Sequence, residues 1–178
     1  MFSKLSDTEL IALLTPKNVQ SSSAYAELCS RYQNKLAAYL RLNNSIDGDT
    51  INDILQDTFL TAWNKITQLD DHAKLFSWLL TIARNRLMDF FREQKKFNDY
   101  TQWFEQQHSD DLQYEMRHDQ SDLEKLLVHL PSQDREIVLL KAVLELSFDE
   151  ICEVSTLSLS AVKMRYYRAL DTLSNLSE

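Results

Sequence analysis

Two stretches of the sequence combine cations with hydrogen-bonding side chains, and their chemistry is the easiest to interpret. The first stretch, 83–96, contains five cations against only two acids, Asp89 and Glu93. The second, 159–168, contains three cations together with serine, methionine and tyrosine. Clustered Arg and Lys side chains bind the phosphates of nucleic acids, and mixed donors contact base edges. For the first stretch, a solvated basic helix end stabilised by the helix dipole is an equally good interpretation.

The composition argues against most enzyme classes. The 178 residues include one glycine, which leaves nothing for the glycine-rich loops that hold phosphates or dinucleotides. Cys29, Cys152 and the four histidines fit no metal-ligand spacing, and no nucleophile-base set is present. The sequence therefore predicts no catalytic residue, no metal site and no cofactor. No apolar run approaches the ~20 residues that span a bilayer, so we expect a cytoplasmic protein without membrane insertion.

The net charge of −8 is distributed unevenly along the chain. Residues 1–96 sum to +1, residues 97–122 to −6 and residues 123–178 to −3. The middle segment is polar and acidic without a sustained apolar period, which is typical of a linker. We therefore expect two folded units, 1–96 and 123–178, joined by an acidic linker. The aromatic pair Trp103–Phe104 in this linker is consistent with docking on a neighbouring unit or with anchoring a partner protein.

Apolar side chains recur at helical spacing throughout the first unit, which predicts four helices. A capping box, Ser6 with Glu9, begins a short first helix. The longer helices are expected over 24–42, 50–66 and 74–96. The last two are expected to bury Ile51, Ile54, Leu55, Phe59, Ala62, Trp63 and Ile66, then Leu75, Leu79, Leu80, Ala83, Leu87 and Phe91.

The second unit is also helical, so the predicted fold class is all-α with two small helical domains. Its helices are expected over 123–130, 132–144, 147–154 and 159–176. A short helix, a four-residue break and a long helix form a helix-turn-helix, whose second helix enters the major groove of DNA. The expected buried stripe of that helix is Leu159, Val162, Tyr166, Ala169, Leu170 and Leu173. The side chains expected outside are Ser160, Lys163, Met164, Arg165, Tyr167 and Arg168.

Several motifs resemble one protein family. The segments 53–63 (DILQDTFLTAW) and 76–89 (FSWLLTIARNRLMD) resemble regions 2.2 to 2.4 of the extracytoplasmic-function, or group IV, sigma factors of bacterial RNA polymerase. These factors belong to the sigma-seventy superfamily. The segments 130–140, 147–151 and 161–170 resemble region 4 of the same family. Because the motifs occur in the family's order and cover both units, the resemblance implies a sigma factor that directs promoter recognition, DNA melting and transcription initiation.

For the first unit, the resemblance implies two surfaces. The helix matching 53–63 docks in this family on the coiled coil of the polymerase β′ clamp, and the implied contacts are Asp53, Gln56 and Asp57. In this family, the helix matching 75–96 melts the minus-ten promoter element and holds flipped bases. Stacking and polar contacts to these bases offset the free-energy cost of unstacking them. Its implied contacts are Asn85 for a base edge and Arg84, Arg86, Arg92, Lys95 and Lys96 for phosphates.

For the second unit, the resemblance implies recognition of the minus-thirty-five element. The implied contacts are Ser160, Lys163, Arg165 and Arg168, and the unit would also contact the β flap of the polymerase. The acidic linker either occupies the basic nucleic-acid path of the polymerase as an RNA-like polyanion or simply stays soluble and extended. Because phosphate neutralisation supplies most non-specific affinity, we expect this acidic chain to bind DNA only with the polymerase. An anti-sigma factor is a further implied partner.

The sequence departs from the family pattern before the Gln-Asp pair. Family members commonly have an Asp-x-Glu-Asp cluster where residues 50–53 read Thr-Ile-Asn-Asp, so two expected carboxylates are missing. Thr50 is well placed to cap the helix, with Asp53 three residues on. A phosphate on Thr50 would restore a charge of about −1.5 to −2. We therefore hypothesise that phosphorylation of Thr50 by a Ser/Thr kinase switches on polymerase binding.

The turn of the helix-turn-helix also departs from the pattern, because Thr156 stands where the family usually has glycine. A β-branched residue in a left-handed turn costs roughly 1 kcal/mol or more. Either the turn has another shape or the unit is less stable.

Two other functional classes share parts of this pattern. A stand-alone helix-turn-helix transcriptional regulator would explain the last 56 residues, but it would need an N-terminal sensor, and 24–96 shows no ligand or phospho-acceptor pattern of that sort. An anti-sigma or scaffold protein would explain the acidity, but such proteins lack the ordered motifs. An enzyme is the least favoured class.

Overall fold

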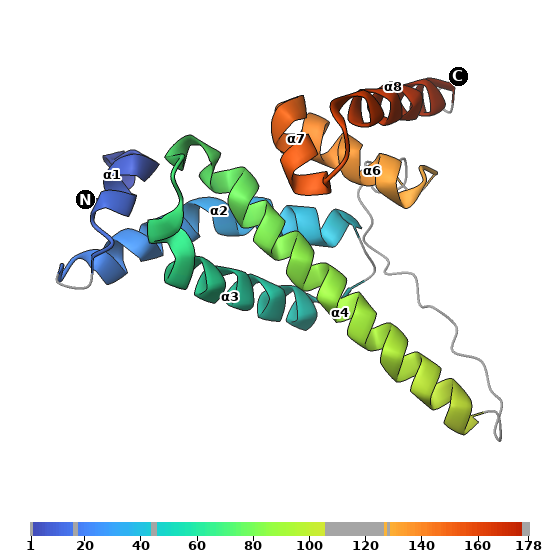
Figure 1. Ribbon diagram of the computed structural model, residues 1–178, viewed down its shortest axis with the longest axis horizontal. Helices are drawn as coiled ribbons and strands as arrows, with labels where there is room; N and C mark the ends of the chain where they lie inside the picture. Colours follow the sequence, from blue (N-terminus) through green and yellow to red (C-terminus); the bar gives the residue numbers. More distant parts are fainter. Residues whose placement is uncertain (1, 16–17, 44–45, 106–126, 128, 176–178) are drawn as a thin grey trace.

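The computed structural model describes residues 2–15, 18–43, 46–105, 127 and 129–175, with backbone alone at 42–43 and 96–105. These residues form helices joined by short turns, with no strand among them (Figure 1). The predicted all-α fold class is therefore confirmed. No helix in the described part of the chain is long and apolar enough to cross a membrane.

The N-terminal unit, residues 2–105, is built from three long helices and shorter pieces. In chain order these are η1 (Phe2–Lys4), α1 (Asp7–Ala12), α2 (Ser21–Asn43), α3 (Gly48–Lys65), η2 (Ile66–Gln68), η3 (His72–Lys74) and α4 (Leu75–Glu105). The predicted capping box is present, because Glu9 N–H donates to Ser6 Oγ and Ser6 N–H donates to the Glu9 carboxylate. The expected cap of α3 is wrong: Asp47 caps this helix by accepting the Thr50 N–H at 2.7 Å.

The apolar stripes of α2, α3 and α4 meet in one core. The buried apolar side chains from α3 and α4 are Ile51, Ile54, Leu55, Ala62, Leu75, Leu79, Leu80, Ala83 and Leu87, as expected. Phe59, also expected in the core, is only partly buried. Two other expected core residues lie at the edge of the core. Trp63 is 39% exposed and packs edge-on against Tyr25, while Phe91 is 36% exposed beyond the last buried turn of α4. Exposure at the end of a stripe depends on how far the neighbouring helix extends, and α4 runs on past α3 (Figure 1).

α4 is longer than the sequence pattern predicted. The helix was expected to end at Lys96, but its backbone continues to Glu105, so the expected boundary of the helix is wrong. The preceding turns already form a helix, and adding residues to an established helix is easier than starting a new one. The side chains of Trp103 and Phe104, and the whole of 106–122, lie outside the described residues.

The C-terminal unit, residues 127 and 129–175, contains the predicted helix-turn-helix. Its described elements are α6 (Ser132–Val138), the π-helical η4 (Leu139–Val143), α7 (Phe148–Ser155) and α8 (Leu159–Asn175). The expected helix over 123–130 lies mostly outside the described residues. α7 begins with the predicted capping box of Ser147 and Glu150, and α8 begins where Ala161 N–H donates to Ser158 Oγ. α6 and α7 support α8 from one side, which presents the other side of α8 outward.

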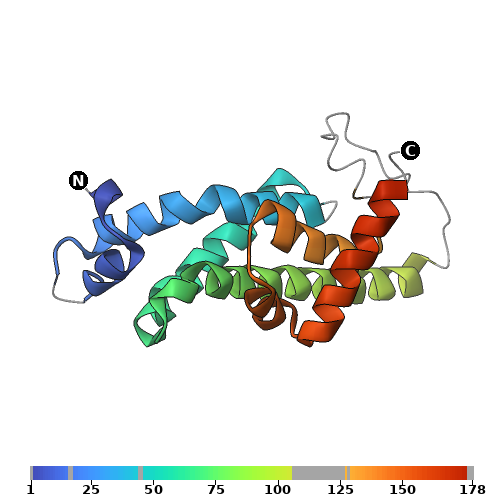
Figure 2. The ribbon, with the colours of Figure 1, turned by 90° about the horizontal axis from the view of Figure 1, so that it is seen from above.

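The two units pack against each other. α7 crosses the N-terminal half of α4, and α6 touches α2, so buried side chains of both units form one continuous core. Figure 2 shows the C-terminal helices lying in front of the middle part of α4. The first unit contributes most of this core, and the second contributes Ile137, Leu140, Leu144, Leu146, Ile151, Val154 and Val162. The position of the C-terminal unit is thus set by the same apolar burial that holds the N-terminal helices together.

The turn between α7 and α8 has the left-handed shape that normally selects glycine. Thr156 has φ 61° and ψ 19°, and its backbone N–H donates to the Cys152 carbonyl to end α7. The turn is therefore shaped as in a glycine-containing motif, and the threonine bears the steric cost of its Cβ.

Replacing Thr156 by glycine should stabilise the protein. Thr156→Gly removes the clash in the left-handed region, so we expect the free energy of unfolding in urea to rise by about 1 kcal/mol. The matched control is Thr172→Gly within α8, where the same substitution should cost about 0.5 kcal/mol. A loss of stability in both variants would contradict the assignment of strain to Thr156.

Candidate nucleic-acid interface

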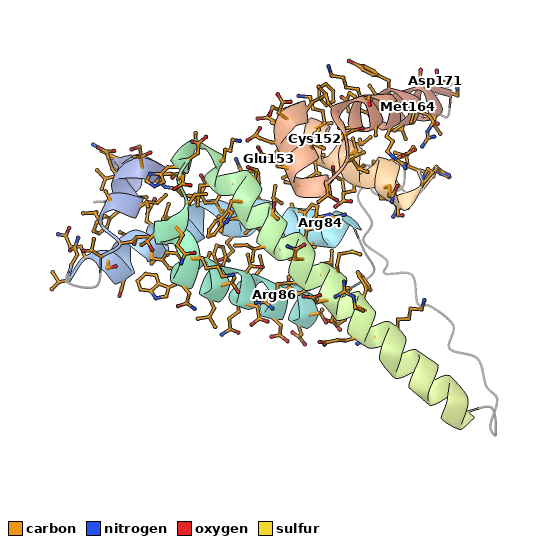
Figure 3. All side chains as sticks on the ribbon, viewed as in Figure 1. Arg84, Arg86, Cys152, Glu153, Met164 and Asp171 are labelled. Carbon is orange, nitrogen blue, oxygen red and sulfur yellow. The ribbon has the colours of Figure 1, made fainter. Side chains whose placement is uncertain are left out.

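The cations of α4 do not form one surface. Arg86 points toward α3 and its Nη2 donates to Thr61 Oγ1 at 2.9 Å, whereas Arg84 points toward the C-terminal unit (Figure 3). Arg92 is exposed and pairs with Asp89 one turn back at 2.6 Å. Asn85 and Lys95 are exposed. The side chain of Lys96 lies outside the described ones. The expected minus-ten residues are thus on three sides of the helix, and only some of them face solvent.

Arg84 is held in an ion pair that joins three helices. Its Nε donates to Glu136 Oε1 of α6 at 2.8 Å, and the hydroxyl of Tyr39, on α2, donates to the same oxygen at 2.7 Å. The Arg84 and Glu136 side chains are only 22% and 15% exposed. Burial opposes the charge of Arg84, but the hydrogen bond and charge of Glu136 outweigh it and raise the Arg84 pKa. Burial, and then Glu136, raise the pKa of Tyr39 far above its usual value, so its hydroxyl stays a donor.

A second ion pair crosses between the units at the start of α4. Lys74 Nζ donates to Glu153 Oε1 of α7 at 2.5 Å. The Glu153 carboxylate raises the pKa of Lys74. Both side chains are about half exposed, and exposed ion pairs contribute little to stability because water screens them. Lys74 and Arg84 therefore both face carboxylates of the C-terminal unit, but only the Arg84 pair is desolvated.

The expected polymerase contacts lie together on α3. Asp53, Gln56 and Asp57 are exposed, and their spacing places them on one side of the helix, opposite the buried stripe. Leu60 continues this line one turn further and is 60% exposed. We call Asp53, Gln56, Asp57 and Leu60 the α3 face. Sequence reasoning missed Leu60, although an apolar residue outside the buried stripe was a readable signal.

The outer side of α8 carries the expected DNA-reading residues. Ser160 and Lys163 are exposed, as are Met164 and Tyr167. In Figure 3, Met164 and Asp171 lie on the side of α8 away from α6 and α7. Two residues expected in the buried stripe, Leu159 and Leu170, are exposed instead, because α6 and α7 cover only the side of α8 centred on Val162 and Ala169.

Arg165 and Arg168, expected to contact DNA, share a buried partner. Asp134 of α6 is almost wholly buried; its Oδ1 accepts Arg165 Nη1 at 2.8 Å, and its Oδ2 accepts Arg168 Nη2 at 2.6 Å. Arg168 Nε donates to the same Oδ2 at 3.1 Å. Asp134 thus fixes both guanidinium groups on the flank of α8. Sequence reasoning missed it, because an acid in the first turn of a helix is fully explained by the helix dipole.

The Asp134 cluster should hold the C-terminal unit together. Asp134→Asn leaves two arginines beside a buried neutral group, so we expect the free energy of unfolding to fall by about 2 kcal/mol. Exposed Asp171→Asn, the matched control, should change it by less than about 0.5 kcal/mol. In a double-mutant cycle, the cost of Asp134→Asn should shrink when Arg165 and Arg168 are both replaced by Met. An undiminished cost would show that Asp134 does not act through the two arginines.

Comparison with known proteins identifies the family to which the two units belong. Residues 28–97 match the family model of Sigma-70 region 2, and residues 120–173 match that of Sigma-70 region 4. The ECF RNA polymerase sigma factor RpoE of Cereibacter sphaeroides is 27% identical over 97% of both chains.

Solved structures agree with the sequence relatives. CnrH, named as an RNA polymerase sigma factor of Cupriavidus metallidurans, superposes with a TM-score of 0.65 at 26% identity over 96% of both chains, in a complex with the cytosolic domain of CnrY. RpoE of Bartonella quintana, in complex with the anti-sigma factor NepR, superposes with a TM-score of 0.64 at 23% identity over 89% of this chain and 97% of that one. The matched regions occupy both units in the order of the family, and the chain belongs to the extracytoplasmic-function sigma factors of the sigma-70 family.

Proposed function

We propose that this sigma factor binds core RNA polymerase through the α3 face and reads promoter DNA with α4 and α8. The observation that carries the proposal is the exposure of Asp53, Gln56, Asp57 and Leu60 along one side of α3. The other side of α3 is committed to the core, so this line of side chains has no structural role within the described part of the chain. Two carboxylates around a polar amide and an exposed leucine suit a basic, partly apolar helical partner. The partner implied by the family is the β′ clamp coiled coil.

The two DNA elements are assigned to different units. Asn85, Arg86, Arg92 and Lys95 are exposed on α4 and suit the unpaired minus-ten strand, with Arg84 joining them once it is released from Glu136. Ser160 and Lys163 at the start of α8 suit base edges and phosphates of the minus-thirty-five duplex. Arg168 keeps about half of its side chain exposed despite Asp134 and suits a backbone phosphate, while the more buried Arg165 mainly supports it.

Run-off transcription with core polymerase tests the function as a whole. On a genomic fragment library, we expect the chain to redirect initiation to a specific set of promoters. Asp57→Ala removes an exposed carboxylate of the α3 face and should lower affinity for core polymerase about fivefold or more, the equivalent of about 1 kcal/mol.

The control for Asp57 is Glu93→Ala, which removes an exposed carboxylate from α4 of the same unit and should leave core affinity unchanged. Equal losses in both variants would contradict a specific role of the α3 face. If neither unmodified protein nor Thr50→Asp redirects initiation, the proposed function itself is contradicted.

Phosphorylation of Thr50 by a Ser/Thr kinase is the finer part of the proposal. Thr50 is half-exposed, and its backbone N–H, not its hydroxyl, takes part in the cap with Asp47. A phosphate here would lie in the first turn of α3, where the helix dipole favours negative charge. It would also lie one turn before Asp53, which extends the acidic end of the α3 face toward the positions where family members have carboxylates.

Charge at Thr50 should strengthen polymerase binding. We expect Thr50→Asp to bind core polymerase more tightly than Thr50→Ala, by about threefold for a partial charge mimic and by more for the phosphorylated protein. Fluorescence anisotropy with labelled protein measures both constants. Equal affinities of Thr50→Asp, Thr50→Ala and the phosphorylated chain would dismiss the switch.

An anti-sigma factor is a further proposed partner. The support is the fold shared with the Bartonella quintana RpoE, which was solved with the anti-sigma factor NepR. The acidic linker is proposed to follow the nucleic-acid path of the polymerase, on the strength of its charge of −6 over 97–122.

A further inference from the structure

Both arginines of α8 are engaged on one flank of the helix. Arg165 and Arg168 donate to the buried carboxylate of Asp134 on α6. An arginine that donates to two acceptors of guanine is the commonest specific contact of proteins with DNA. Because the guanidinium groups of α8 are held on its flank, the outer side of this helix would have to read bases with other side chains.

On the outer side of α8, two uncharged residues lie between two cations. At about 3.6 residues per turn, Ser160 and Met164 fall between Lys163 and Arg168 around the helix. Met164 is 59% exposed, and Figure 3 shows it on the side of α8 away from α6 and α7. A helix in the major groove presents its centre to base edges and its flanks to the two sugar-phosphate backbones. This order therefore places the cations beside phosphates, and Ser160 and Met164 against base edges.

Aromatic packing holds Lys163 on its flank. The Nζ of Lys163 lies 5.7 Å from the centroid of the Phe148 ring, at the start of α7. The exposed ring of Tyr167 is tilted against the same phenylalanine, with the two centroids 6.5 Å apart. Because a cation is attracted to the face of an aromatic ring, Lys163 and Tyr167 lean toward α7. Met164 remains the large apolar side chain at the centre of the outer side.

The apolar side chain of methionine matches one feature of the major groove. Among the four bases, thymine presents a methyl group there, whereas the other three present hydrogen-bond donors and acceptors. Packing a methyl group against a thioether removes apolar surface from water. A donor or acceptor covered by Met164 would instead lose its water without gaining a hydrogen bond. Thymine is therefore the base that Met164 favours.

We propose that Met164 is a specificity-determining residue of this sigma factor, and that it contacts the C5-methyl group of a thymine in the minus-thirty-five element. The inference rests on the proposed function, since it takes α8 to enter the major groove. Ser160, one turn earlier on the same side of α8, exchanges a hydrogen bond with the neighbouring base pair. The promoter element recognised by this chain therefore contains a thymine at the position that Met164 contacts.

Exchanging thymine for uracil tests this contact, because uracil lacks only the methyl group. The probe is a promoter fragment found by run-off transcription, in which every thymine of the minus-thirty-five element is replaced by deoxyuridine. Fluorescence anisotropy measures binding of the full chain assembled with core polymerase. We expect the affinity to fall by about threefold for the methyl group that Met164 contacts, which is the effect of burying one such group.

Variants assign the effect of the methyl group to one side chain. Met164→Ala should bind the thymine fragment about threefold more weakly than the unmodified chain, and the change to uracil should then have little further effect. The matched control is Leu170→Ala, which removes an apolar side chain, 39% exposed, from another side of α8. This control should retain the full loss of affinity on the change to uracil.

Met164→Gln provides a second measurement that does not depend on modified DNA. Glutamine keeps the length of the side chain and introduces an amide, which pairs with adenine. Promoter fragments randomised across the minus-thirty-five element are selected by the chain assembled with core polymerase. The unmodified chain should enrich thymine at one position, and Met164→Gln should lose that preference.

Several results would overturn the inference. These are a minus-thirty-five element without thymine, an unchanged affinity for the uracil fragment, and an equal effect of uracil in Met164→Ala and Leu170→Ala. Selection of the same thymine by Met164→Gln would overturn it as well. Run-off transcription distinguishes such a failure from that of the proposed function: a chain that redirects initiation but ignores the thymine methyl group refutes only the role of Met164.

Discussion

The described structure depends on how the short helix α6 places two carboxylates. Asp134 binds Arg165 and Arg168 within the C-terminal unit, and Glu136 binds Arg84 and Tyr39 of the N-terminal unit. Both carboxylates are buried or nearly so, and a buried carboxylate is tolerated only with strong partners. The orientation of α8 and the position of the C-terminal unit over α4 are thereby coupled through α6, a helix of seven residues.

The carboxylates of this acidic protein also engage part of its own positive charge. Three of its candidate DNA-binding cations are paired with carboxylates: Arg84 across the unit boundary, and Arg165 and Arg168 inside the C-terminal unit. Lys74, just before α4, is paired across the unit boundary as well. The α3 face is different, because it presents its own acids to solvent. The proposed surface for polymerase is open in this structure, while several of the proposed DNA contacts are paired with carboxylates.

Much of the fold could be predicted because its signals are local. The capping boxes at Ser6 and Ser147 and the buried stripes of α3 and α4 are periodic features within one or two helical turns. The left-handed turn at Thr156 was one of the two shapes that the sequence left open, and φ 61° decides between them. The errors concern the ends of stripes, as at Phe91, Leu159 and Leu170, because exposure there depends on how far a neighbouring helix extends.

The sequence by itself determined the helices, the helix-turn-helix and the polar side of α3, since each of these follows from the spacing of residues along one helix. Only the tertiary structure decided the partners of the cations. Arg84 and Glu136 are 52 residues apart, and Arg165 and Asp134 are 31 apart. A charge pattern records that a cation is present, but its partner is chosen by helix packing, and that packing is set by apolar burial far from the charges themselves.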